Sequence, residues 1–186
     1  MGEPARTDSD ARIEVHTERL TLVALDRELV RLQVEDRRAF FQTLGASFEA
    51  AWPPVSTDEP KLAEKLELLE RAPEDIGWRG WVVLMAVTPG APMRAVGVGG
   101  FHGPPDARGR VEVGYAMSPS FREQGLATEA VEALVGWAFA QGGVSFIQAR
   151  TLEHLAASRR VLEKTGFTQA GPVDEAGMIT YRLEHG

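Results

Sequence analysis

The architecture of this chain depends most on one stretch, Val111-Glu112-Val113-Gly114-Tyr115-Ala116-Met117-Ser118-Pro119-Ser120-Phe121-Arg122-Glu123-Gln124-Gly125-Leu126-Ala127-Thr128-Glu129-Ala130. Residues 111–117 alternate as a half-buried β-strand does, and the residues from Gly125 onward begin an amphipathic helix. A polar loop joins the two. Backbone N–H groups converge where a strand meets a helix in this way, and such a turn suits a phosphate group.

Size and charge restrict what the chain can be. A sequence of 186 residues, 44% hydrophobic and 25% charged, is typical of one compact domain, which we expect over residues 13–186 after a disordered tail at 1–12. The formal charge of −7 argues against a general nucleic-acid binder, because such proteins neutralise phosphates with Lys and Arg.

Cysteine is absent from the sequence, which excludes disulfides, thiolate metal sites and cysteine nucleophiles. We expect no bound metal. The polar first twelve residues lack the apolar core of a signal peptide, and no later run is long enough to cross a membrane. The cytoplasm is therefore the expected location, without a membrane or nucleic-acid partner.

Gly and Pro divide the rest of the chain into further periodic segments. We expect strands at residues 18–25, 80–87, 94–101, 144–151, 167–170 and 178–183, and helices at 27–41, 60–73, 125–142 and 156–164. The strand at 144–151 follows a crossover helix and should therefore run parallel to the strand at 110–117. The prediction is an α/β (α+β) fold: a mixed, mostly antiparallel sheet of about seven strands with helices on both faces.

Two motifs together resemble a known family. Residues 122–127 fit the pattern Arg/Gln-x-x-Gly-x-Gly/Ala, and Ser158-Arg159-Arg160-Val161-Leu162-Glu163-Lys164-Thr165-Gly166-Phe167 follows after a helix and a strand. In this order they resemble the GCN5-related N-acetyltransferases (GNAT). The runs Glu112-Val113-Gly114-Tyr115 and Ala127-Thr128-Glu129-Ala130 look most like the branch that acetylates the N-termini of ribosomal proteins.

The resemblance implies acetyl-coenzyme A as the acetyl donor. In the family, the strands that correspond to residues 110–117 and 145–151 part at their ends, and the pantetheine arm lies in the gap. The implied contacts are the amides of Met117 and Ser118 on the arm, and a loop around the pyrophosphate formed by Arg122, Gln124, Gly125, Leu126, Ala127 and Thr128. Glycine allows close backbone approach and the helix N-terminus carries partial positive charge, so the loop suits an anion on physical grounds too. Glu123 departs from the family pattern, and we expect its side chain to face solvent.

Glu112 is the candidate general base. Acetylation of an amine requires a neutral amine and a route for its proton. Strand alternation places Glu112 on one face with Gly114 and Ala116, beside open space. Glu112 is equally compatible with a solvated position, an arginine partner or a role in binding the substrate ammonium, and His102 is an alternative base.

Ser158 is the second catalytic candidate. It matches the serine of the ribosomal-type branch, where it lies near the coenzyme sulfur, and its hydroxyl would hydrogen-bond the thiolate. Helix N-capping is the alternative role for a serine in a first helical turn. The sequence also departs from the wider family, with Leu162 in place of a tyrosine acid and Leu155 in place of an asparagine that contacts pantetheine.

The acceptor is less well specified. Trp52 is a candidate for substrate binding, because it falls in the helical region that covers the acceptor site in the family. The acidic surplus, with Glu35, Asp36 and Glu49 nearby, would suit a cationic acceptor. A protein N-terminus and a small-molecule amine both remain open, as do an antibiotic- or polyamine-type acetyltransferase, a non-catalytic acyl-coenzyme A sensor and a generic nucleotide-binding domain. Nothing in the sequence opposes a homodimer.

Overall fold

The computed structural model describes residues 12–54 and 59–186, so the predicted tail lies outside the described residues except for Arg12. Within the described part, the strands are β1 (Glu14–His16), β2 (Leu20–Ala24), β3 (Trp81–Met85), β4 (Arg94–Phe101), β5 (Arg110–Met117), β6 (Phe146–Leu152), β7 (Thr168–Gln169) and β8 (Met178–Glu184). The helices are α1 (Arg27–Glu35), α2 (Arg37–Thr43), α3 (Glu59–Arg71), α4 (Leu126–Ala140) and α5 (Ala156–Lys164), with short 3₁₀ turns at Pro73–Asp75 and Pro119–Phe121.

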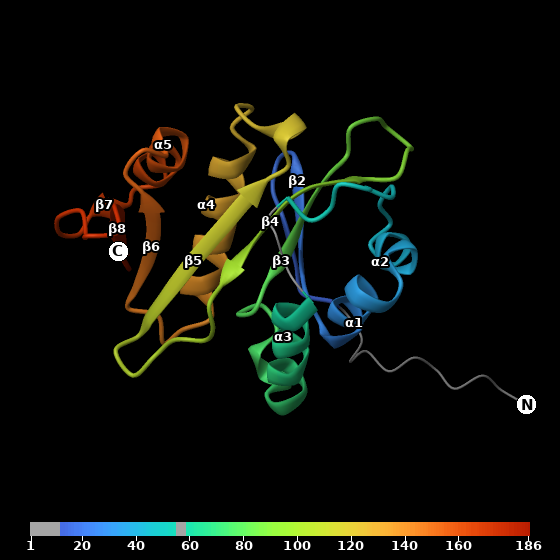
Figure 1. Cartoon of the computed structure of the whole chain (residues 1–186), viewed down its shortest axis with the longest axis horizontal. Coiled ribbons are helices and arrows are strands. Elements are labelled where there is room, and N and C mark those ends of the chain that lie inside the picture. The colour runs from blue at the N-terminus through green and yellow to red at the C-terminus, as the bar shows by residue number, and fades with distance from the viewer. Residues whose placement is uncertain (1–11, 55–58) are drawn as a thin grey trace, which may run out of the picture.

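The strands form one mixed sheet in the order β1-β2-β3-β4-β5-β6-β8-β7. Neighbouring strands are antiparallel except β5 and β6, which are parallel as predicted. These two strands pair only from Arg110 with Phe146 to Val113 with Ala149. Beyond that point β5 remains paired only with β4 and β6 only with β8, and Figure 1 shows β5 and β6 diverging toward their carboxyl ends. The predicted gap between the two strands is therefore present.

Alternation along β5 determines which of its residues are buried. Val111, Val113 and Met117 are buried in a core cluster with α4, whereas Glu112 and Ala116 on the opposite face are only half-buried. A second cluster packs α1 and α2 against the other face of β2, β3 and β4. Figure 1 shows no helix in front of β5 and β6 on that second face. Half of the sheet is thus covered on both faces, and half leaves one face accessible.

Two local features differ from the sequence-based prediction. The single helix expected over 27–41 is divided at Asp36, which has φ −148° and accepts hydrogen bonds from the N–H groups of Arg38 and Ala39. A residue that caps a new helix in this way cannot continue the old one. The additional strand β1 pairs with β2 across a turn at residues 17–19. Its three residues are too few for a clear alternation signal.

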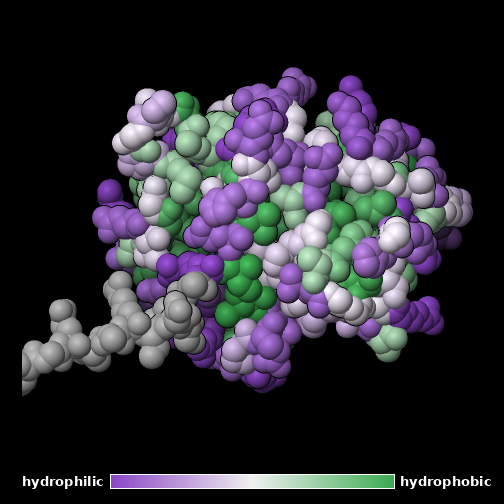
Figure 2. All heavy atoms as spheres, turned by 180° about the vertical axis from the view of Figure 1, so that it is seen from behind, coloured by the Kyte–Doolittle hydropathy of each residue, from purple (hydrophilic) through white to green (hydrophobic). Residues whose placement is uncertain are grey.

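No helix in the described ranges is both long and apolar enough to cross a membrane. Seen from behind, the molecule carries hydrophilic side chains over most of its area, and apolar side chains show in separate patches between them (Figure 2).

Candidate active site

The peptide groups of β5 explain how the gap can bind a ligand. The N–H of Ser118 donates to the carbonyl of Val96 at 2.8 Å, and the N–H of His102 donates to the carbonyl of Glu112 at 3.0 Å. Since hydrogen-bonding direction alternates along a strand, the N–H groups of Tyr115 and Met117 face away from β4 and into the gap. The N–H of Met117 thus faces the gap, whereas the N–H of Ser118 is already used within the sheet.

The loop before α4 leaves several N–H donors free. Gly125 is the N-cap residue with φ 77°, and no side chain caps the helix. Within the described part of the chain, the N–H groups of Leu126, Ala127 and Thr128 have no hydrogen-bond partner. An uncapped helix N-terminus of this kind binds anions through its donors and its dipole.

The side chains of this loop point in different directions. Glu123 has φ 60° and is exposed, which confirms that its carboxylate faces solvent. Gln124 donates to the carbonyl of Ser120 at 3.1 Å, and Arg122 donates through Nε to the carbonyl of Met117 at 3.1 Å. Arg122 therefore joins the loop to the end of β5, beside the gap.

Arg19, in the turn between β1 and β2, holds the loop from outside. Its Nη1 donates to the carbonyl of Gln124 at 2.9 Å, and its Nε donates to Glu129 at 2.7 Å. Glu129 also accepts from the hydroxyl of Thr17 at 2.5 Å. Burial alone would raise the pKa of Glu129, but the hydrogen bonds from Thr17 and Arg19 outweigh it and lower the pKa. The sequence carries no signal for this contact, because the partners are 110 positions apart.

Glu112 and His102 lie opposite each other on β5 and at the end of β4. Glu112 Oε1 is 3.5 Å from His102 Nδ1, and the two side chains are 23% and 68% exposed. A Cβ built on Gly114 would lie 3.7 Å from His102 Nε2, so the space beside the imidazole depends on a small residue there. The structure thus brings the two candidate bases together on the accessible face of the sheet.

Ser158 of α5 and Tyr115 of β5 contact each other. Tyr115 OH lies 3.3 Å from Ser158 Oγ and donates to the carbonyl of Ser158 at 3.2 Å. Burial raises the pKa of Tyr115 more than the hydrogen bond from Ser158 lowers it, so the phenol stays protonated. The N-cap position of α5 is Leu155, with no side-chain cap, so the alternative capping role of Ser158 is wrong. Tyr115 is absent from the predicted site, because alternation places it among core residues.

A cavity of about 250 Å³ lies on the same sheet face as Glu112. Its floor includes Gly100, Gly114 and Ala116, and its wall includes Lys65 from α3 and His102. Small residues on the floor keep the space open next to the splayed half of β5. This cavity is the candidate acceptor site.

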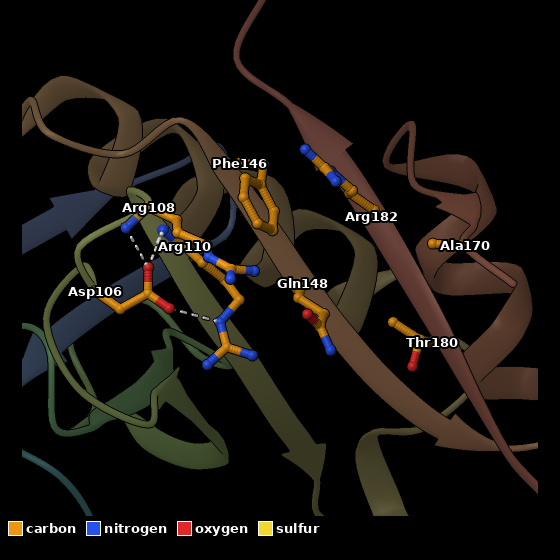
Figure 3. A pocket seen from close by; sticks show the side chains of 8 residues that line it. All are labelled: Asp106, Arg108, Arg110, Phe146, Gln148, Ala170, Thr180 and Arg182. Atoms are coloured by element: carbon orange, nitrogen blue, oxygen red, sulfur yellow. Dashed lines mark hydrogen bonds and ion pairs between the residues drawn. The ribbon is translucent and has the colours of Figure 1, made fainter. Parts of the chain in front are cut away.

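A second cavity of about 360 Å³ lies where β5 and β6 are still paired, and Figure 3 shows the side chains that surround it. Arg110 forms an ion pair with Asp106 at 3.0 Å, and Arg182 pairs with Glu184 at 2.6 Å while its guanidinium lies 3.7 Å from the centre of the Phe146 ring. This cavity does not reach the gap between the strands.

Trp52 is not placed at a substrate-facing surface. It is 5% exposed and packs against Phe40 and Phe41 in the second core cluster, which corrects the prediction of a substrate contact. Apolar burial decides its position here. Two of the acidic residues considered for a cationic acceptor also have structural partners, since Asp36 caps α2 and Glu49 pairs with Arg94.

Residues 27–168 match the acetyltransferase (GNAT) domain. The chain belongs to this family. It is 29% identical over 153 residues to an uncharacterized N-acetyltransferase, YjdG of Bacillus subtilis, covering 82% of this chain and 88% of the relative. This GNAT chain also shares its fold with RimL, a ribosomal L7/L12 α-N-protein acetyltransferase solved with coenzyme A (TM-score 0.64, 18% identity, 92% and 98% covered). A Salmonella typhimurium acetyltransferase that modifies the N-terminal serine of L7/L12 is equally similar (TM-score 0.64, 18% identity, 94% and 100% covered). The family and fold predicted from the two motifs are confirmed.

Proposed function

We propose that this chain transfers the acetyl group of acetyl-coenzyme A to a primary amine by direct attack on the thioester. The observation that carries the proposal is the gap between β5 and β6, which opens beside the uncapped N-terminus of α4. In the reaction a C–N bond forms and the C–S bond breaks. The amine loses one proton and the coenzyme leaves as a thiol.

The donor would bind along the gap. The free N–H groups of residues 126–128 suit the pyrophosphate, with Gly125 allowing close approach. The N–H groups of Tyr115 and Met117 suit the pantetheine amides. The neighbour RimL, which was solved with coenzyme A, has the same fold and supports this placement.

Glu112 and His102 would manage the proton of the amine. An α-amino group, with a reference pKa of about 8, is partly neutral at pH 7, whereas a lysine amine at about 10.4 is not. A carboxylate on the accessible face can accept the proton directly or through a water, and the imidazole 3.5 Å away can share it. Both a small-molecule amine and a protein N-terminus are compatible acceptors for this step.

Ser158 and Tyr115 would act on the leaving sulfur. Both are hydroxyl donors, and their oxygens lie 3.3 Å apart where α5 approaches β5. A protonated phenol next to the serine can supply the hydrogen bond that the family tyrosine, replaced here by buried Leu162, would otherwise provide. A hydrogen bond to the departing thiolate stabilises the charge that develops in the transition state.

The decisive experiment measures thiol release from acetyl-coenzyme A with a panel of amines and peptides, and identifies acetylated products by mass spectrometry. We expect stoichiometric release of thiol and a product 42 Da heavier than its acceptor, the mass change of replacing one hydrogen by acetyl. Tight coenzyme binding without thiol release across the panel would instead support a non-catalytic sensor.

A further inference from the structure

Lys65 occupies an unusual position in α3. Leu62 and Leu69, three residues before and four after it, are buried, so Lys65 lies on the apolar stripe of an amphipathic helix. Its side chain is half-buried and lines the 250 Å³ cavity. A Cβ built on Gly80 would lie 2.9 Å from its Nζ, so the ammonium rests against bare backbone.

The ammonium of Lys65 has no hydrogen-bond or ion-pair partner within the described residues. Burial lowers the pKa of Lys65, which is the sign of a charge held away from water without compensation. Arg79, which lines the same cavity, differs because it pairs with Asp75 at 2.5 Å. A half-buried cation without a counter-ion is costly unless an anion arrives from outside.

Two chemically distinct groups therefore line the cavity. His102 and Gly114 lie beside Glu112, where an amine would lose its proton. Lys65, next to Gly80, offers an unpaired positive charge. A volume of about 250 Å³ suits a molecule of amino-acid size.

We propose that the acceptor is a small primary amine that also carries a carboxylate, and that Lys65 binds this carboxylate while the amine lies beside Glu112. The inference rests on the proposed acetyl transfer and extends it to the acceptor. It replaces the cationic acceptor suggested by the acidic surplus of the sequence.

The arginine-lined cavity is the competing place for an anion. It lies on the same sheet face, since Arg110 is two residues from Glu112 and Gln148 pairs with Glu112 in register. In this second cavity Arg108 corresponds to Lys65, because the Arg108 side chain also has no ion-pair partner within the described residues. Arg108 is exposed, however, so water already solvates its charge. A bound anion would therefore stabilise the charge of Lys65 more than that of Arg108.

The test compares acceptors in pairs. The acceptors are ω-amino acids and α-amino acids of increasing length, each assayed beside its carboxamide. For each pair, kcat/KM of the acid is divided by kcat/KM of the amide. This ratio is measured in the wild type, in Lys65→Met and in Arg108→Met. Differences in amine basicity cancel when ratios are compared between variants. We expect Lys65→Met to lower the ratio by about tenfold or more, as loss of a charge-assisted hydrogen bond does. Arg108→Met should leave it within about twofold.

Binding of the N-acetylated product, measured by calorimetry without coenzyme, gives a second readout. The acid form should bind the wild type more tightly than its amide, and Lys65→Met should abolish the difference while keeping or raising the Tm. An unchanged acid-to-amide ratio in Lys65→Met, or its loss in Arg108→Met instead, would overturn the assignment although amines were still acetylated. Absence of thiol release with every amine would instead refute the acetyl transfer itself.

Discussion

At the scale of single residues, Glu112 has the most specific of the proposed chemical roles. Its carboxylate is 23% exposed and lies 3.5 Å from His102 Nδ1. Glu112→Gln keeps the shape and removes the base, so we expect kcat to fall by about 10²–10⁴-fold with the coenzyme Kd unchanged. Steady-state kinetics and calorimetry measure the two quantities. His102→Asn should cost less, because the imidazole contacts Glu112 from a more exposed position. Equal turnover in Glu112→Gln and the wild type would exclude the base role.

Tyr115 and Ser158 should behave as one unit. If their hydroxyls both act on the sulfur, Ser158→Ala and Tyr115→Phe each lower kcat by about tenfold. Because the hydroxyls lie 3.3 Å apart, we expect the double variant to lose less than the product of the single losses. Pre-steady-state kinetics with acetyl-coenzyme A measure the chemical step. Strictly multiplicative effects, or no effect of either change, would contradict a shared role.

Some residues of the candidate site can be predicted from local sequence patterns, and others depend on contacts between distant parts of the chain. Strand alternation singles out Glu112 and the second motif singles out Ser158. Ser158 contacts Tyr115 of the diverging part of β5. Glu112 lies just before the strands part, still paired with Gln148. The sequence does not predict Tyr115 or Lys65 as site residues, because periodicity assigns both positions to the core. Their proposed roles depend on the divergence of β5 from β6 and on the cavity beside α3. The position of Arg19 at the loop rests on a hydrogen bond to Gln124, which is 105 positions away in the sequence. No spacing rule predicts such a contact.

At the scale of the elements, the proposed coenzyme site depends on the loop before α4. Gly125 has φ 77°, and a Cβ there would have its nearest contact at 3.5 Å from Arg19, so an added side chain meets backbone strain rather than a clash. Gly125→Ala and Gly125→Glu share that strain, which costs about 1 kcal/mol. Only Gly125→Glu adds a negative charge at the proposed pyrophosphate site.

We therefore expect Gly125→Glu to weaken acetyl-coenzyme A binding by at least about 100-fold, since like charges repel at an anion site, and Gly125→Ala to weaken it by about tenfold or less. Calorimetric Kd values, with Tm as a check on folding, measure the effect. Equal losses in the two variants would indicate strain alone. Unchanged affinity in Gly125→Glu would remove the loop from the coenzyme site.

Elements with strong local signals are predicted well. β4, β5 and α5 have the predicted bounds, and the crossover from β5 through α4 to β6 gives the predicted parallel pair. The break at Asp36 is missed, because residues on both sides continue the apolar periodicity and only the side-chain cap ends α1. β1 is missed for the opposite reason, since three residues carry too little pattern and its pairing with β2 determines it.

At the scale of the whole molecule, Glu129 connects the turn between β1 and β2 to the start of α4. Its carboxylate is 14% exposed on the side chain and accepts hydrogen bonds from Thr17 and from the backbone and guanidinium of Arg19. One ionised group thereby connects the turn between β1 and β2, the loop before α4 and the first turn of α4. Loss of that charge should loosen all three together.

The sign of the pH dependence follows from the lowered pKa of Glu129. Because the folded state binds this proton more weakly than the unfolded state, the contribution to stability is present above the unfolded pKa of about 4.3 and is lost as pH falls through the folded pKa. Glu129→Gln should therefore lower the free energy of unfolding at pH 7, and the difference from wild type should shrink as the pH falls below about 4. Urea unfolding over this range measures it. Glu132→Gln, an exposed change on the same helix, is the control and should show no such trend. A difference that stays constant with pH would mean that Glu129 acts through packing and not through its charge.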